Sequence, residues 1–158
     1  MKTTFLRSLL LLGIAGASLS TAAPASAQDW TKARDEAVAN LQALVRLDTS
    51  DPATGNETAV VKRIQGILAR EGIESRIYEK EPGRGNLVAR LKGSGAKRPL
   101  LLMGHIDVVG VERDSWTADP FAAEIKDGYV WGRGTLDIKS QMITALEPVG
   151  NMQKQRSR

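Results

Sequence analysis

Three residues of this chain combine the types and the spacing needed to bind a metal ion: His105, Asp107 and Asp137. In an extended backbone, residues two apart point to the same side, roughly 6.5 to 7 Å apart, so His105 and Asp107 are expected to face one site. A neutral imidazole binds a metal through one ring nitrogen, while the other donates to a carboxylate or carbonyl. Asp107 could orient that imidazole or a catalytic carboxylate nearby. The alternative is a histidine that ends a strand beside a solvated aspartate.

Asp137 closes a second polar stretch, residues 132–137, at the start of an expected helix. Its simpler interpretation is a helix N-cap, since aspartate is favoured there. Gly132 and Gly134 could serve only to permit a tight turn. Trp116 and Phe121, which precede this stretch, could be ordinary core residues, because aromatic side chains bury well.

The elements that must position these residues follow from the spacing of apolar side chains and from turn formers. Spacings of three and four predict helices over 31–47, from Asn56 or Thr58 to just before Gly72, and from Asp137 onward. Strands are expected over 74–79, 86–91, 99–104, 123–125 and 129–131. Residues 151–158 offer no apolar face and are predicted to form a frayed tail.

The apolar run from Pro99 to Gly104 ends directly before His105. A continuous rather than alternating apolar run is typical of a strand covered on both faces in an α/β sheet. The carboxyl end of such a strand is where these folds place their chemistry. The fold class expected from the pattern is therefore α/β.

Residues 1–27 have the pattern of a secretory signal peptide. Lys2 and Arg7 precede an apolar run, and small residues lead to cleavage after Ala27. A membrane anchor is the alternative, but the run is far shorter than the roughly 20 residues that span a bilayer. We therefore expect a secreted or periplasmic protein with no membrane association after cleavage. The chain has no cysteine, so disulfides cannot stabilise it.

The charge distribution argues against nucleic-acid binding. The formal net charge of +4 falls to +2 once Lys2 and Arg7 are removed, and the last eight residues carry the remaining excess. A nucleic-acid interface needs basic side chains gathered on one face, often with stacking aromatics. Nothing between Gln28 and Gly150 supplies such a surface.

Together and in this order, the stretches 104–109, 119–121, 127–128 and 132–139, with Trp116, resemble the peptidase M20 family of metallohydrolases. The resemblance covers Asp29 to about Val149, roughly the first third of a typical family chain. It implies a partial three-layer, zinc-peptidase-like catalytic domain with a mixed sheet over residues 28–150. The family's lid or dimerisation domain would be absent.

The resemblance also implies roles for the three polar residues. His105 is similar to the family's first zinc ligand, and Asp107 to the catalytic-site carboxylate beside that ligand. Asp137 is similar to the carboxylate that bridges two zinc ions. The implied reaction is zinc-dependent hydrolysis of a small peptide or an N-acyl amino acid, with a glutamate deprotonating the attacking water.

The chain has too few ligands for the complete site of that family. It holds one histidine where two are needed, and no Glu-Glu pair follows Asp137. Glu147 is the one acidic residue after Asp137, and its mid-helix position favours a solvent-facing side chain. At most a partial zinc site is expected, and the chain alone is expected to be inactive.

Two alternatives remain open. The chain could be half of a split enzyme that a complementing partner chain completes, or a non-catalytic binding remnant. An incomplete sheet would also expose a central strand as an edge, which favours self-association.

Overall fold

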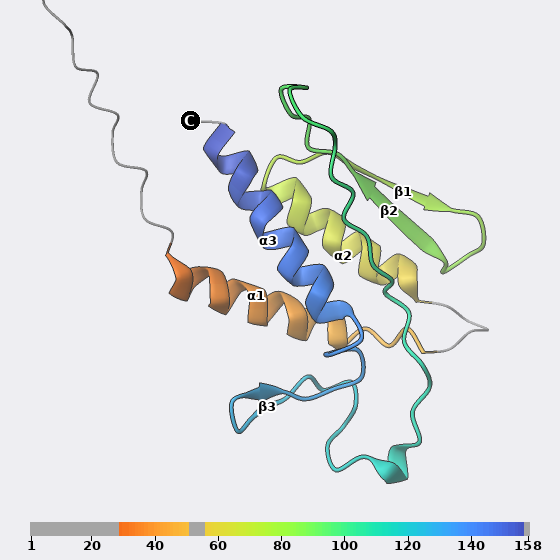
Figure 1. Ribbon diagram of the computed structural model, residues 1–158. Helices are drawn as coiled ribbons and strands as arrows, with labels where there is room; N and C mark the ends of the chain where they lie inside the picture. Colours follow the sequence, from red (N-terminus) through yellow and green to blue (C-terminus); the bar gives the residue numbers. More distant parts are fainter. Residues whose placement is uncertain (1–28, 51–55, 157–158) are drawn as a thin grey trace, which may run out of the picture.

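The computed structural model describes residues 29–50 and 56–156, so the expected signal peptide lies outside the described residues. Three helices and two antiparallel strand pairs make up this part of the chain (Figure 1). The helices are α1 (Trp30–Val45), α2 (Glu57–Arg70) and α3 (Lys139–Arg156), with a short 3-10 helix, η1 (Arg113–Ser115). The strands are β1 (Ser75–Glu79), β2 (Gly85–Ala89), β3 (Ile125–Lys126) and β4 (Tyr129–Val130). All were expected from the sequence except η1, and their ends are shifted by a residue or two, apart from the end of α3.

One apolar cluster joins the three helices. Helix α1 packs along α3, and the β1–β2 hairpin covers α2 (Figure 1). The buried members of the cluster come from all three helices and from the turn after α2: Leu44, Val60, Ile64, Leu68, Ile73 and Ile143. Burial of this apolar surface is the main favourable contribution to folding in a chain without disulfides.

Local signals set the helix ends. The Asp29 carboxylate accepts a hydrogen bond from the Lys32 backbone N–H at 3.0 Å and so caps α1. Helix α2 stops at Gly72, whose φ of +69° suits glycine, and the Ile73 N–H returns to the Leu68 carbonyl at 2.9 Å. The turn predicted at Gly72 is therefore confirmed.

The β1–β2 hairpin is anchored to the start of α2. Its register places Ile77 opposite Leu87. Arg84, in the turn, forms an ion pair with the buried carboxylate of Glu57. The Gly85 N–H donates to Thr58 Oγ1 at 2.9 Å, an approach so close that a side chain at Gly85 would collide with α2.

The expected strand over 99–104 is wrong for the described structure. In Figure 1 the segment runs as an extended trace across α2, and it pairs with no described strand. Leu100, Leu101 and Met103 are 82%, 78% and 83% exposed, so the segment is not covered on both faces. The physical reason is that no described strand pairs with the segment, so its outer side chains lack a neighbouring layer within the described residues.

The frayed tail expected over 151–158 is also wrong as far as Arg156, because α3 continues to that residue. Polar contacts replace the missing apolar face. Lys154 Nζ lies 2.9 Å from the Glu71 carboxylate at the end of α2, and Arg156 donates to the Lys92 carbonyl. Basic residues in a last helical turn also interact favourably with the helix dipole.

The α/β class is confirmed, while the three-layer domain with a mixed sheet stays a prediction, since the described strands form two antiparallel pairs. Within the described ranges, no helix is both long enough and apolar enough to cross a membrane.

Candidate metal centre

Thr49, in the turn after α1, holds the segment that carries His105 and Asp107. Its hydroxyl donates to the Ile106 carbonyl at 2.7 Å, and its own carbonyl accepts from the Val108 N–H at 3.3 Å. Thr49 is 2% exposed, so both bonds are shielded from water. Because side chains alternate along an extended chain, turning Ile106 and Val108 inward leaves His105 and Asp107 facing outward together.

The imidazole of His105 lies between the two aspartates. Its Nδ1 is 3.0 Å from the Asp107 carbonyl oxygen and 3.2 Å from Asp107 Oδ1. Its Nε2 is 3.2 Å from Asp137 Oδ1. The structure thus brings together all three residues singled out from the sequence, although Asp137 lies on a different segment.

The local electrostatics favour the protonated imidazole. The hydrogen bond to the Asp107 backbone raises the pKa of His105 above its ordinary value, and the Asp107 and Asp137 carboxylates add to that effect, while burial opposes it. When the ring is neutral and its Nδ1–H donates to Asp107, the free lone pair lies on Nε2. That atom is the one that faces Asp137.

A tight turn places Asp137 beside the imidazole. Gly134 has a φ of +86°, and a Cβ there would lie 2.8 Å from the Val108 side chain and 3.2 Å from that of Lys139. The Lys139 N–H donates to the Gly134 carbonyl at 2.9 Å, which closes the turn at the start of α3. Asp137 lies two residues before the first residue of α3, and its carboxylate is 80% exposed and faces His105.

Sequence reasoning missed Lys139, the fully buried lysine below this turn. Its Nζ donates to the Leu44 carbonyl at 3.1 Å and the Leu47 carbonyl at 2.8 Å, so it caps the end of α1. Burial lowers its pKa to about 8. No spacing rule distinguishes this lysine from a solvated one, since its burial depends on how α1 and α3 meet.

A cavity of about 330 Å³ adjoins the three polar residues, and residues of the 132–137 turn line it. Trp116 forms one wall and is half-buried, with the Arg133 guanidinium over its ring at 5.1 Å. The indole is therefore a wall of the candidate site rather than a residue of the apolar cluster.

The described part of the chain contains no group of three or more His, Cys, Asp or Glu side chains arranged to hold a metal ion. His105 and Asp137 supply two donor atoms that face one another, and Asp107 orients the ring from its other side. Such a pair could hold part of a metal's coordination shell, and further donors would have to come from elsewhere.

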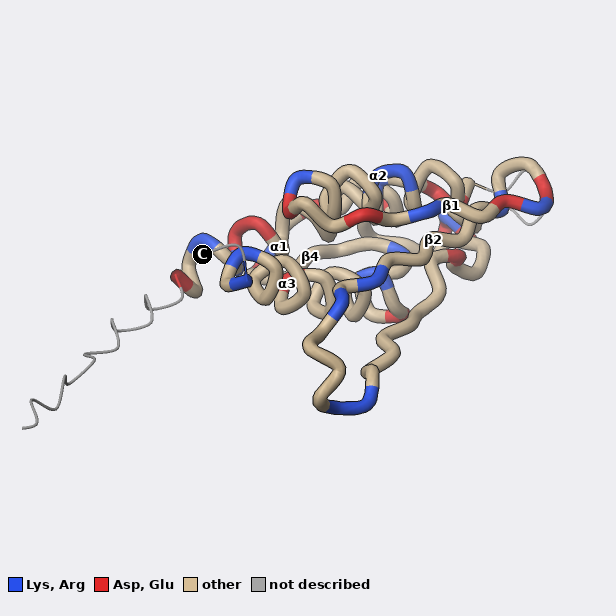
Figure 2. The backbone as a smooth tube through the Cα atoms, turned by 90° about the horizontal axis from the view of Figure 1, so that it is seen from above, with Lys and Arg blue, Asp and Glu red and all other residues tan. Residues whose placement is uncertain are grey.

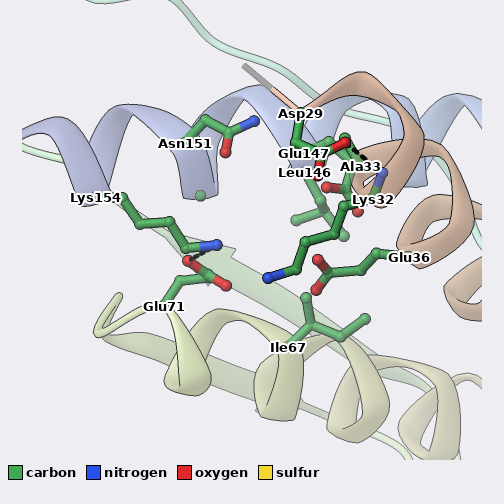
Figure 3. A pocket seen from close by; sticks show the side chains of 11 residues that line it. Asp29, Lys32, Ala33, Glu36, Ile67, Glu71, Leu146, Glu147, Asn151 and Lys154 are labelled. Atoms are coloured by element: carbon green, nitrogen blue, oxygen red, sulfur yellow. Dashed lines mark hydrogen bonds and ion pairs between the residues drawn. The ribbon is translucent and has the colours of Figure 1, made fainter. Parts of the chain in front are cut away.

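A second cavity, of about 160 Å³, lies between the three helices, away from this turn (Figure 3). Carboxylates of Glu36, Glu71 and Glu147 line it together with the ammonium groups of Lys32 and Lys154. Glu147 is half-buried here, contrary to the solvent-facing position expected from the sequence. Burial, followed by repulsion from Glu36, raises its pKa.

Comparison with known proteins identifies a family. The model of peptidase family M20/M25/M40 matches residues 101–158, which include the three polar residues and their turn. A succinyl-diaminopimelate desuccinylase of Cereibacter sphaeroides is 41% identical over 98 residues, covering 61% of this chain and 25% of the relative. An N-formyl-4-amino-5-aminomethyl-2-methylpyrimidine deformylase of Halalkalibacterium halodurans is 34% identical over 118 residues, covering 73% of this chain and 28% of the relative.

The chain thus spans about a quarter of the length of these relatives. The family match falls on the stretch where the structure brings His105 and Asp107 to Asp137. The names of the two relatives denote a desuccinylase and a deformylase. The chain, which covers part of the length of these relatives, therefore belongs to the peptidase family M20/M25/M40.

Proposed function

We propose that this chain is the N-terminal part of an exported metallohydrolase that cleaves a peptide or N-acyl amide bond with two zinc ions. His105 and Asp137 would be metal ligands, and Asp107 would position the imidazole. The relatives' names denote removal of a succinyl or a formyl group, which supports an N-acyl substrate. The pattern of residues 1–27 supports export to a secreted or periplasmic location.

The observation that carries this proposal is the 3.2 Å separation of His105 Nε2 and Asp137 Oδ1. Two donors on one tetrahedral zinc, each at about 2.0 to 2.1 Å, lie roughly 3.3 Å apart. The pair therefore has the spacing of neighbouring ligands without any rearrangement. Hydrogen bonding of Nδ1 to Asp107 leaves Nε2 available for a metal.

Each of the three residues would have a separate task. His105 would contribute a neutral nitrogen donor, Asp137 an anionic oxygen, and Asp107 would keep the ring in the orientation seen here. When bound, zinc supplies Lewis-acid polarisation of the carbonyl and lowers the pKa of a nearby water. The described site has no base that could take the water's proton. The residues of this chain would therefore bind the metal and orient its histidine ligand only.

Zinc titration by calorimetry tests the proposed site. The purified chain is expected to bind zinc weakly, and both His105→Ala and Asp137→Asn are expected to abolish that binding. Asp127→Asn, which changes an exposed turn aspartate of the same charge, is the matched control and should leave binding unchanged. Zinc binding that survives His105→Ala would disprove the proposed ligand set.

An activity assay tests the proposal that this chain can bind zinc but cannot catalyse hydrolysis by itself. The chain alone is expected to show no turnover of a dipeptide, an N-succinyl or an N-formyl amino acid with added zinc, because it lacks the second histidine and the glutamate base. Metal-dependent turnover that His105→Ala removes would show that the chain carries a complete active site by itself.

A further inference from the structure

The turn at the end of α1, residues 44–49, contacts both segments that carry the candidate metal ligands. Helices α1 and α3 lie side by side (Figure 1, Figure 2), and the first residue of α3 donates to the end of α1. Leu44 and Val45 are fully buried, and Thr49 is nearly so. Hydrogen bonds made by this turn are therefore shielded from competing water.

Thr49 holds the first ligand segment. Its hydroxyl donates to the Ile106 carbonyl, and its own carbonyl accepts from the Val108 N–H. The two bonds grip the backbone on either side of Asp107 and directly after His105. A segment held at two points cannot slide or rotate without leaving a buried polar group unpaired, which is costly. The position of His105 therefore follows that of Thr49.

The second ligand segment is held at two places on the same turn. The buried ammonium of Lys139 donates to two carbonyls of the turn, at 3.1 and 2.8 Å. Gly132 rests directly on Val45, since a Cβ at Gly132 would lie 2.6 Å from Val45 Cγ1. Asp137 lies between these two anchors in the sequence. Both sides of the loop that carries Asp137 are thus fastened to the end of α1.

The two ligand segments also touch one another through side chains. A Cβ at Gly134 would lie 2.8 Å from Val108 Cγ1, and Arg133 donates a long hydrogen bond, of 3.4 Å, to a carbonyl of the first segment. Among the residues that the structure describes, no backbone hydrogen bond joins residues 104–110 to residues 132–139. Apart from side-chain contacts, the connection between the two segments therefore runs through the end of α1.

Local hydrogen bonds fix the conformation of this turn. The Asp48 carboxylate accepts from the Ser50 N–H at 2.9 Å and from the Ser50 hydroxyl at 2.6 Å. The Asn56 side-chain amide donates to the Asp48 carbonyl at 3.0 Å, which fastens the turn to the start of α2. Contacts with two helices thus hold the turn that the ligand segments share.

We propose that residues 44–49 form a platform that sets the distance between the two metal ligands, with Thr49 and Lys139 as its positioning residues. Thr49 fixes the position of His105, and Lys139 fixes that of Asp137. Each acts through the backbone of the segment that it holds, without touching the metal. The functional meaning of the platform rests on the metal site proposed above, but the platform also determines the geometry of the metal-free chain.

A site with few ligands depends strongly on such a platform. His105 Nε2 and Asp137 Oδ1 are 3.2 Å apart in the metal-free chain, so a metal finds them already at the spacing of neighbouring ligands. Loosening either segment widens the range of this distance, and the metal must then order the ligands at the expense of affinity.

Zinc affinity of single variants tests the two positioning residues. Thr49→Val keeps the shape of the side chain but removes its hydroxyl, and Lys139→Met removes both bonds to the turn. Each should weaken zinc binding by about tenfold or more. Thr49→Ser, which keeps a hydroxyl, should retain the affinity of the unmodified chain.

Ile73→Val is the matched control for a general loss of stability. Ile73 is buried beyond the end of α2, at the opposite end of that helix from Asn56. The variant shortens a core side chain and lowers stability without touching the platform. Its zinc affinity should equal that of the unmodified chain.

The double variant Thr49→Val/Lys139→Met tests whether the two residues act on the same distance. Once one ligand is loose, freeing the other adds little. The double variant should therefore lose less affinity than the product of the two single losses, whereas independent effects multiply.

Nuclear magnetic resonance of the metal-free chain tests the platform without zinc. His105 is the chain's one histidine, so its ring signals are unambiguous. Lys139 acts on the ring only through Asp137, yet Lys139→Met should shift these signals, as should Thr49→Val. Ile73→Val should leave them unchanged.

Unchanged ring signals and unchanged zinc affinity in folded Lys139→Met, or single losses that multiply in the double variant, would overturn the platform and leave the proposed metal site standing. If the unmodified chain bound no zinc, the proposed function would fail, and the metal-free ring signals would decide on the platform alone. Should circular dichroism show that Lys139→Met does not fold, Val45→Ala, which removes the contact with Gly132, takes its place with the same expected losses.

Discussion

The ammonium of Lys139 lies 2.8 Å from the carbonyl oxygen of Leu47, in the interior of the protein. The contact joins the start of α3 to the end of α1. Because Asp137 precedes Lys139 by two residues, the same contact fixes the point from which Asp137 reaches His105. The geometry of the candidate metal centre therefore depends on a helix cap that is not part of it.

Replacing Lys139 with methionine should destabilise the fold. The change keeps most of the side-chain volume but removes both hydrogen bonds to the end of α1, which should cost about 1 to 3 kcal/mol. Urea unfolding measures the effect. Lys62→Met, an exposed position on α2, is the matched control and should stay within about 0.5 kcal/mol of the unmodified chain. Equal stability of the two variants would rule out a capping role for Lys139.

Glu147 should make stability fall as the pH rises. Burial and the neighbouring Glu36 carboxylate raise its folded-state pKa above the ordinary 4.5 expected of the unfolded chain, while Asn40 and Lys154 oppose the shift. Between those two values the native state holds more protons than the unfolded state, so its stability is greatest on the acidic side. The free energy of unfolding, measured from pH 4 upward, should decline through this window.

Glu147→Gln should remove that part of the pH dependence, because glutamine does not titrate. Glu124→Gln, an exposed position outside the cavity, should leave the decline intact. A decline of the same size in the Glu147→Gln variant would assign the pH dependence to other groups.

The features that the sequence predicted well are those determined by local pattern. Val60 and Ile64 mark the buried face of α2 by spacing alone, and Gly72 marks its end. The proximity of His105 and Asp107 followed from strand alternation. Their approach to Asp137 rested on a family resemblance, because no local rule connects residues 32 positions apart.

The features that were mispredicted depend on contacts between distant parts. Leu101 has the sequence of a buried strand, yet burial requires a neighbour that the described residues do not supply. The stretch around Arg156 has no apolar face, yet it is helical, and Arg156 donates a hydrogen bond to the Lys92 carbonyl. Lys139 is buried because two carbonyls of α1 meet it, and nothing in its neighbourhood in sequence signals that contact.

Asp107→Asn should weaken zinc binding by about 10- to 100-fold, the usual effect of losing a carboxylate that orients a ligating histidine. Asparagine keeps the backbone carbonyl that contacts Nδ1 but removes the negative charge at 3.2 Å. Competition with a zinc-sensitive dye measures the affinity. Asp114→Asn, in η1, controls for the general loss of one negative charge. Unchanged affinity in Asp107→Asn would show that the backbone contact alone orients the ring.

Gly134→Ala should disturb both the fold and the metal centre. At a φ of +86° an alanine is strained, and its Cβ would lie 2.8 Å from Val108 and 3.2 Å from Lys139. We expect a loss of about 1 to 3 kcal/mol in unfolding free energy. Zinc affinity should fall as well, because the turn positions Asp137. Gly110→Ala is the matched control, since a Cβ there meets nothing within 4 Å, and it should change neither quantity. If Gly134→Ala lost stability but kept full zinc affinity, Asp137 would not depend on this turn for its position.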